Sequence, residues 1–259
     1  MNGLIQWPRA KYWDRAWNPI IGCRPCSPAC DNCYAKTMAK RFGMGFEPHE
    51  GKDRNPPRKG VVFCGNMTDL FGDWTYDSED YIRRSLGYSD KATYLWLTKR
   101  PHNMCEALKN GKAFIRGNPY DELPFSEFDF SNQFFGFTAE NQETYDERFE
   151  VWRSEKPDWT NGWLSAEPLL GPIDLHLNCI APEDLPFKWV VVGCESGTNR
   201  RPCPVEWVEF VVAQCVGREI PVFVKQLDVG GKCVTDIDKF PDHLRVRQVP
   251  WTSERRKDD

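Results

Sequence analysis

Four of the chain's 11 cysteines lie close together near the start of the sequence, and their side chains suit metal chemistry. They are Cys23, Cys26, Cys30 and Cys33. Thiolates are ligands for both iron and zinc. Three thiolates on one compact loop can bind three irons of a [4Fe–4S] cluster and leave the fourth iron open. The group therefore predicts a metal site, and an iron–sulfur cluster is the leading interpretation.

Two overlapping triplets suit such a cluster. Cys26, Cys30 and Cys33 have the spacing C-x3-C-x2-C, which is typical of radical S-adenosylmethionine (SAM) enzymes. With Cys23 in place of Cys26, the spacing becomes C-x6-C-x2-C. The alternative is a structural zinc site that uses all four thiolates. Zinc sites more often pair two C-x-x-C motifs separated by about a dozen residues or more, so this crowded spacing favours the cluster.

The composition indicates where such a site would operate. The cysteine count is odd and residues 1–15 lack the apolar core of a signal peptide, so we predict a cytoplasmic protein without a disulfide framework. No run of about 18 apolar residues is present, and no membrane partner is predicted. The net charge of −4 does not indicate general nucleic-acid binding, although residues 99–100 and 200–201 are local basic pairs.

Short apolar runs alternate with helical patterns along the chain, which predicts an α/β fold with a mainly parallel sheet. Strands are expected at residues 18–22, 61–65, 94–97, 134–137, 163–165, 190–193 and 222–225. Helices are expected at residues 34–42, 78–86, 102–110, 143–154 and 205–216. We predict one domain over residues 1–227, with an insertion at about 43–60. Residues 228–259 are predicted to form a C-terminal extension that ends in a polar, disordered tail from residue 252.

Nearly every expected strand is followed by polar residues. In parallel α/β folds, ligands bind at the carboxyl ends of the strands. This regularity predicts a barrel with a site at its mouth. The polar residues in question are Cys23, Asn66, Asp69, Thr98, Lys99, Arg100, Thr138, Glu140, Glu167, Glu195, Ser196, Lys225 and Gln226.

Several of these residues are expected to bind SAM. Asn66 and Asp69 suit its amino group or ribose, although both types are also common in turns and helix caps. Lys99 and Arg100 suit its carboxylate or a substrate phosphate, and the alternative for this pair is a solvated surface. The predicted cofactor-binding residues are Asn66, Asp69, Thr98, Lys99, Arg100, Glu140 and Ser165.

Other residues at the same edge are expected to act on the substrate. A glutamate at a strand end can bind substrate or transfer a proton, and a lysine beside it can neutralise its charge. Cys194 suits a hydrogen-atom donor, and the alternative is a small buried packing residue. The predicted catalytic residues are Glu167, Glu195, Lys225 and Cys194.

Motifs spread along the chain resemble a known family, the phage-associated three-cysteine proteins (DUF5131), which are classed as radical SAM-like. The matching motifs lie at residues 17–23, 27–35, 66–71, 97–101, 165–173, 192–197 and 223–226. The resemblance implies a partial or complete β/α (TIM-like) barrel of the radical SAM type, with a [4Fe–4S] cluster and S-adenosylmethionine as cofactors. It also implies that Cys23, Cys30 and Cys33 are the ligands, so that Cys26 is an additional cysteine and the alternative first ligand.

These observations together predict a radical SAM enzyme that depends on an external electron donor. Because members of the family occur in phages, the expected substrate is a nucleotide or a modified DNA base, such as a 5-substituted pyrimidine. One alternative is a zinc-stabilised binding module without enzymatic activity. Another is a radical SAM enzyme that acts on a small metabolite or a peptide. The oligomeric state is not predicted.

Overall fold

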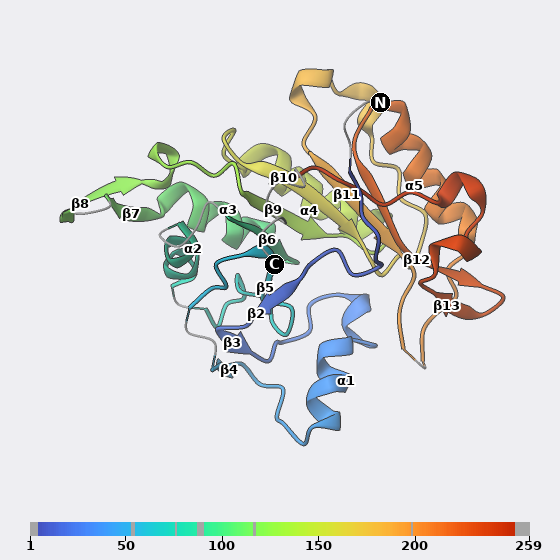
Figure 1. Cartoon of the computed structure of the whole chain (residues 1–259), viewed down its shortest axis with the longest axis horizontal. Coiled ribbons are helices and arrows are strands. Elements are labelled where there is room, and N and C mark those ends of the chain that lie inside the picture. The colour runs from blue at the N-terminus through green and yellow to red at the C-terminus, as the bar shows by residue number, and fades with distance from the viewer. Residues whose placement is uncertain are drawn as a thin grey trace.

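The protein is described here by a computed structural model that covers residues 5–52, 55–75, 77–86, 91–115, 118–197 and 199–251. These residues form a mixed α/β fold around one curled sheet (Figure 1). The predicted tail at residues 252–259 lies outside the described residues. Among the residues that are described, no helix is long and apolar enough to cross a membrane.

The main sheet is an open half-barrel. Its parallel strands are β2 (Arg15–Trp17), β5 (Gly60–Cys64), β6 (Ala92–Thr98), β9 (Gln133–Thr138), β10 (Asn161–Ala166), β11 (Trp189–Gly193) and β12 (Val222–Val229). They lie side by side in chain order, and β13 (Lys232–Val234) runs antiparallel along β12. This sequential order is that of a β/α barrel, but β2 and β13 are unpaired edges in the described sheet, so the barrel is not closed.

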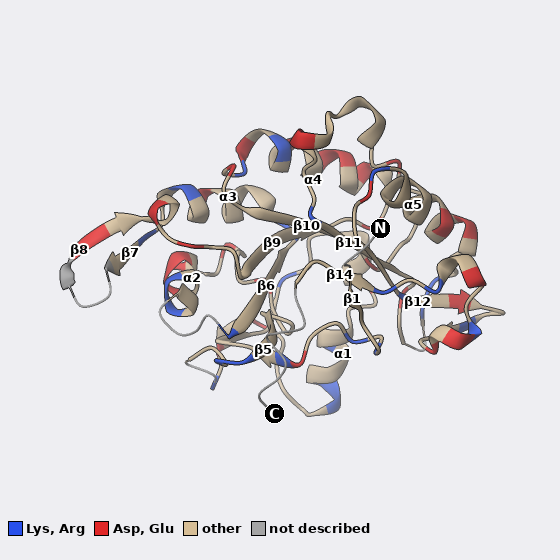
Figure 2. Ribbon diagram, turned by 45° about the horizontal axis from the view of Figure 1, so that its top comes forward, with Lys and Arg blue, Asp and Glu red and all other residues tan. Residues whose placement is uncertain are grey.

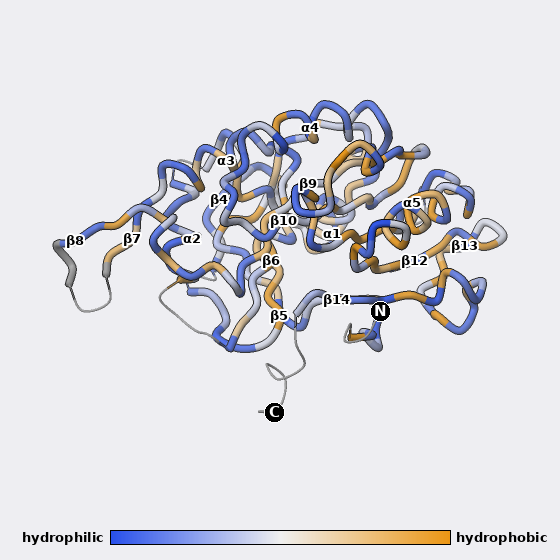
Figure 3. The backbone as a smooth tube through the Cα atoms, turned by 90° about the horizontal axis from the view of Figure 1, so that it is seen from above, coloured by the Kyte–Doolittle hydropathy of each residue, from blue (hydrophilic) through white to orange (hydrophobic). Residues whose placement is uncertain are grey.

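Four helices cover the outer face of the sheet, as Figure 1 shows. They are α2 (Ser78–Leu86), α3 (Pro101–Asn110), α4 (Gln142–Glu155) and α5 (Val205–Gly217). Alternate strand residues such as Trp96 and Val192 pack against helix residues such as Leu108 and Val211 in one large buried cluster. The central strands are accordingly largely hydrophobic (Figure 3), and many of the charged residues lie on the helices (Figure 2).

The inner face carries a second cluster, which both ends of the chain help to build. Leu95, Trp163 and Phe223 point to this face from three strands. The terminal segments contribute Trp7, Tyr12, Val249 and Trp251. These segments meet where β1 (Ile5–Gln6) pairs antiparallel with β14 (Gln248–Val249). They therefore fill the inner face with aromatic rings and leave free the positions two residues further along the strands.

The first predicted strand, 18–22, contains only a two-residue strand, which lies outside the main sheet. The sheet strand is β2, and Pro19 follows it and lacks the N–H group that would continue the ladder. The chain then forms β3 (Ile20–Ile21), which pairs with β4 (His49–Glu50) from the expected insertion. The other expected strands and all the expected helices overlap observed elements.

Other elements were not expected. The hairpin of β7 (Lys112–Ile115) and β8 (Asn118–Pro124) projects from the body in Figure 1. Residues from 228 onward continue β12 and add β13 and β14. Short 3-10 helices lie at Phe125–Glu127, Leu177–Cys179, Pro182–Asp184, Ile237–Lys239 and Asp242–Leu244.

The inner cluster predicts that the end of the chain is needed for stability. Trp251 is 6% exposed and its ring contacts those of Trp7 and Trp189. We expect Trp251→Ala to lower the free energy of unfolding by about 3–5 kcal/mol, measured by urea denaturation. Phe114→Ala, at a ring that is 46% exposed on β7, is the control and should change it by less than about 0.5 kcal/mol. Equal effects would contradict the packing.

Candidate functional site

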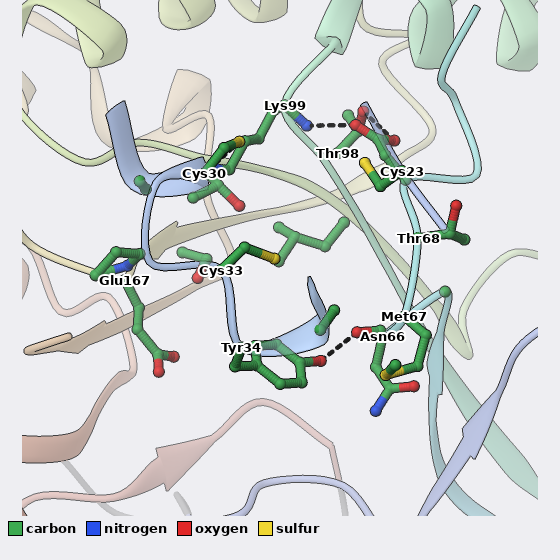
Figure 4. Close-up of a pocket in the computed structure, with 18 of the residues that line it drawn as sticks. Cys23, Cys30, Cys33, Tyr34, Asn66, Met67, Thr68, Thr98, Lys99 and Glu167 are labelled. Atoms are coloured by element: carbon green, nitrogen blue, oxygen red, sulfur yellow. Dashed lines mark hydrogen bonds between the residues drawn. The ribbon is translucent and has the colours of Figure 1, made fainter. Parts of the chain in front are cut away.

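A cavity of about 430 Å³ opens at the carboxyl ends of the parallel strands. Its wall includes strand residues that follow the inner cluster by two positions, namely Leu97, Ser165 and Lys225. The predicted site residues in this wall are Cys23, Cys26, Cys30, Cys33, Asn66, Asp69, Thr98, Lys99, Arg100, Ser165, Glu167, Cys194, Glu195 and Lys225. Glu140 is not part of the wall. Figure 4 shows Cys23, Cys30 and Cys33 at the cavity.

The cysteine loop is the segment from Gly22 to Tyr34. Gly22 has a φ of 92°, and a Cβ atom there would lie 2.4 Å from the Glu47 carbonyl oxygen, so only glycine fits before Cys23. A 3-10 turn, Pro28–Cys30, and a backbone bond from Cys33 N to the Cys30 carbonyl (3.4 Å) compact the rest of the loop. Helix α1 (Tyr34–Arg41) then begins beside the cavity.

Glu140 anchors one side of this loop from below the cavity. Its side chain is fully buried between Lys99 Nζ at 2.5 Å and Arg148 Nη1 at 2.9 Å. Ser27 of the loop donates a hydrogen bond to the same carboxylate (2.6 Å). Burial opposes ionisation, but the two cations outweigh it and hold the pKa of Glu140 below its ordinary value. The structure thus gives Glu140 contacts that position the loop.

Glu195 anchors the other side of the loop. Its carboxylate accepts a hydrogen bond from Asn32 Nδ2 at 2.9 Å and pairs with Arg201 at 2.5 Å. Arg201 Nη1 also donates to the carbonyl oxygen of Pro28 (3.0 Å). Burial raises the pKa of Glu195, but these donors outweigh burial and lower it. The loop is therefore held on both sides by buried carboxylates that follow β9 and β11.

Asp69 joins the ends of two neighbouring strands. It accepts hydrogen bonds from the Thr98 hydroxyl (2.8 Å), from the Lys99 backbone N–H (3.0 Å) and from Arg100 Nη1 (3.2 Å). The Arg100 guanidinium also lies over the Trp74 ring, 4.8 Å from its centroid. Asp69 and Thr98 thus form a network that orients the basic pair.

Cys30 has a strongly perturbed thiol. A hydrogen bond from Cys26 lowers the pKa of Cys30 to about 4 against the opposing effect of burial, and Lys99 adds to this effect. Lys99 Nζ lies 3.7 Å from the Cys30 sulfur, and the Ser27 hydroxyl oxygen lies 3.6 Å from it. These contacts favour the thiolate, the form in which cysteine binds metals.

The opposite wall holds an unpaired acceptor and an ion pair. Asn66 Oδ1 is buried and has no hydrogen-bond partner among the described residues, while its backbone oxygen accepts a bond from the Tyr34 hydroxyl. Such an orphaned acceptor costs about 1–3 kcal/mol unless a ligand satisfies it. Glu167 pairs with Lys225, whose Nζ lies 6.0 Å from the centroid of the buried Tyr12 ring.

The loop offers the donors that an iron–sulfur cluster needs. Cys23, Cys26, Cys30 and Cys33 are all free thiols, and all line one cavity. In the described part of the chain, no three His, Cys, Asp or Glu side chains are already arranged around one metal position. The residues therefore fit a cluster by their donor chemistry and by lining the same cavity.

Some residues of the site were missed in the sequence. Ser27 and Asn32 lie between the loop cysteines, so their position was a usable signal. Arg148 gave no signal, because it lies within α4 and only the fold turns it toward Glu140. The same holds for Tyr12, which precedes the sheet and reaches the cavity through the inner cluster.

The chain belongs to the family described as protein of unknown function (DUF5131), whose model matches residues 8–240. This match confirms the family that the motifs resembled. No curated protein matches the chain significantly, and neither does any solved structure.

Because Glu140 is buried and paired with two cations, we expect its replacement to destabilise the folded protein strongly. Glu140→Gln leaves Arg148 buried without its counter-charge. We expect this variant to lower the free energy of unfolding, measured in urea at pH 7, by about 3–5 kcal/mol. Glu147→Gln, on the exposed side of the same helix, is the control and should have little effect.

The contribution of Glu140 to the free energy of unfolding should decrease as the pH falls. Because the pKa of Glu140 is lowered in the folded protein, its contribution is complete above the unfolded carboxyl pKa of about 4.3 and is lost as the pH falls through the folded value. The stability difference between wild type and Glu140→Gln should therefore shrink below about pH 4. A constant difference from pH 7 to pH 3 would contradict the assignment.

Proposed function

We propose that this chain is a radical SAM enzyme whose loop cysteines hold a [4Fe–4S] cluster. One observation carries the proposal: free thiols from a single short loop line one cavity at the carboxyl ends of a half-barrel sheet. Cys23, Cys30 and Cys33 are the proposed ligands, and Cys26 is the alternative to Cys23. If bound there, a reduced cluster would supply the electron that splits SAM into methionine and a 5′-deoxyadenosyl radical, and this radical would take a hydrogen atom from the substrate.

The protein's own part is to hold the loop and tune its sulfurs. Ser27 and Asn32 are tied to the carboxylates of Glu140 and Glu195, so the loop keeps its place over the strand ends. Lys99 lies against the Cys30 sulfur, and hydrogen bonds to a ligand sulfur tune the potential of a cluster.

The contacts divide the predicted SAM-binding residues into two groups. The side chains of Asp69, Thr98 and Glu140 are already bonded to other groups of the protein. Asp69 binds Thr98 and Arg100, and Glu140 pairs with Lys99, so we assign all three as positioning residues. Asn66 Oδ1 has no partner, which makes it the acceptor best placed for the SAM amino group. Ser165 also lines the cavity and suits the ribose hydroxyls.

A nucleobase is the substrate class that the surroundings favour. Tyr34 lies in the cavity wall and is 49% exposed, exposed Met38 follows it one turn later on α1, and exposed Phe42 caps the end of this helix. The same helix carries basic residues and no acidic ones (Figure 2). Apolar side chains that stack on bases, next to cations that meet phosphates, are typical of single-strand binding surfaces. We therefore propose a modified base in a nucleotide or in DNA, taken out of the stack.

The cysteine assignment predicts a defined metal content. Anaerobically reconstituted protein should contain about four irons and four acid-labile sulfides per chain and, after reduction, should form 5′-deoxyadenosine from SAM. Cys30→Ala and Cys33→Ala should lose both properties. Cys23→Ala should lose them too, whereas Cys26→Ala should keep the cluster.

The control for these variants is Cys179→Ala, which removes an exposed cysteine that is not part of the cavity wall. It should leave iron content and product unchanged. One zinc per chain in place of iron would contradict the proposal and favour a zinc-stabilised binding module. A cluster that survives in Cys30→Ala would contradict the ligand assignment.

The stacking surface predicts binding of nucleic acid. We expect single-stranded DNA with a 5-substituted pyrimidine to shift the protein in a mobility assay, and Phe42→Ala to weaken binding about 10-fold by removing one stacking side chain. Phe210→Ala, on α5 and 44% exposed, is the matched control and should have no effect. No binding to modified DNA, unmodified DNA or free nucleotides would contradict this substrate class and favour a small metabolite or a peptide.

A further inference from the structure

A pair of cysteines that does not belong to the cysteine loop lies at the wall of the cavity. Cys194 follows β11 and Cys233 belongs to β13, and their sulfur atoms are 3.8 Å apart, with Cys194 donating a hydrogen bond to Cys233. Both are free thiols. Cys194 is fully buried in the wall of the cavity, whereas Cys233 is partly exposed.

Strand β12 holds both cysteines in place. The backbone N–H of Cys194 donates to the Gln226 carbonyl at 3.2 Å, and Cys233 lies opposite Asp228 in the antiparallel ladder. β13 is an edge strand that pairs only with β12 in the described sheet. A disulfide needs a sulfur–sulfur distance of about 2.05 Å, so the two sulfur atoms, now 3.8 Å apart, would have to approach by about 1.8 Å.

The surroundings of the pair give its two thiols different properties. The hydrogen bond from Cys194 lowers the pKa of Cys233 to about 7 against the effect of burial, and Arg200 adds to the lowering. The same bond and burial raise the pKa of Cys194. Cys233 therefore has the accessible and more acidic thiol, which suits the group that attacks a disulfide. Cys194 keeps its proton and suits the group that reacts second.

We propose that Cys194 and Cys233 form a redox-active dithiol that reduces disulfide compounds by thiol–disulfide exchange. The Cys233 thiolate attacks one sulfur of a disulfide R–S–S–R, forming a mixed disulfide and releasing R–S⁻. Cys194 then loses its proton and attacks the Cys233 sulfur, which releases the second R–S⁻ and leaves a Cys194–Cys233 disulfide. The two cysteines are oxidised by two electrons, the compound is reduced to two R–SH, and the two protons from the cysteines complete these thiols.

This activity goes beyond the proposed radical chemistry and does not require it. Neither cysteine belongs to the loop that is proposed to hold the cluster. The thiol of Cys203 contributes to the raised pKa of Cys194, and Cys203 is therefore the rival partner in a disulfide.

The test uses the reduced full-length protein and oxidised glutathione, with alkylation of free thiols and peptide mapping by mass spectrometry. In the wild type we expect peptide mapping to find a Cys194–Cys233 disulfide, with two reduced glutathiones released for each such disulfide formed. Cys194→Ser should instead accumulate one glutathione on Cys233, and Cys233→Ser should lose both the disulfide and this adduct. Cys105→Ser, which changes a buried cysteine in α3, is the control and should behave as the wild type.

Several results would overturn the proposal. They are a disulfide between Cys194 and Cys203, an adduct on Cys194 in place of Cys233, or no Cys194–Cys233 disulfide in protein whose circular dichroism shows that it is folded. Because the measurement is disulfide formation and not SAM cleavage, its failure would leave the proposed function standing. A failure to form 5′-deoxyadenosine would likewise leave the dithiol standing.

Discussion

The site depends on one buried carboxylate, that of Glu140, which two cations hold in its charged form below the cavity. A lone buried charge would be too costly to keep, so Lys99 and Arg148 must stay beside it. Because Lys99 follows β6, Glu140 follows β9 and Ser27 lies in the cysteine loop, this one group ties the loop to two strand ends. The pairing of Glu195 with Asn32 and Arg201 repeats the arrangement on the other side.

Side chains from both ends of the chain fill the interior of the half-barrel, and the cysteine loop lies beyond this filled part. Rings such as Tyr12 and Trp251 cover the inner face over the first part of the strands. The cavity is what remains at the carboxyl ends, where the loop lies across it. Stability and site are therefore connected, since the side chains that close the inner face also set the depth of the cavity.

Much of this arrangement follows from local patterns in the sequence. Parallel strands deliver their carboxyl ends to one edge, which is why Asn66, Lys99 and Glu167 were correctly expected to lie together. The sequence did not predict which of these residues line the cavity and which lie beneath it. For a glutamate at a strand end, this depends on partners far away in the chain. Ser27 is separated from Glu140 by 113 residues. The first strand was misplaced because the chain leaves the main sheet at Asn18 and Pro19, whereas Ile20 and Ile21 after them are residue types typical of a buried strand.

The most direct test of the cysteine loop is electron paramagnetic resonance of the reconstituted, dithionite-reduced protein, recorded before and after addition of SAM. If the loop holds a [4Fe–4S] cluster with one open iron, we expect a cluster signal whose g values change when SAM binds, and no such signal in Cys30→Ala. A cluster signal that SAM leaves unchanged would contradict an open iron beside the cavity. The absence of any cluster signal from protein that contains zinc would contradict the iron–sulfur assignment itself.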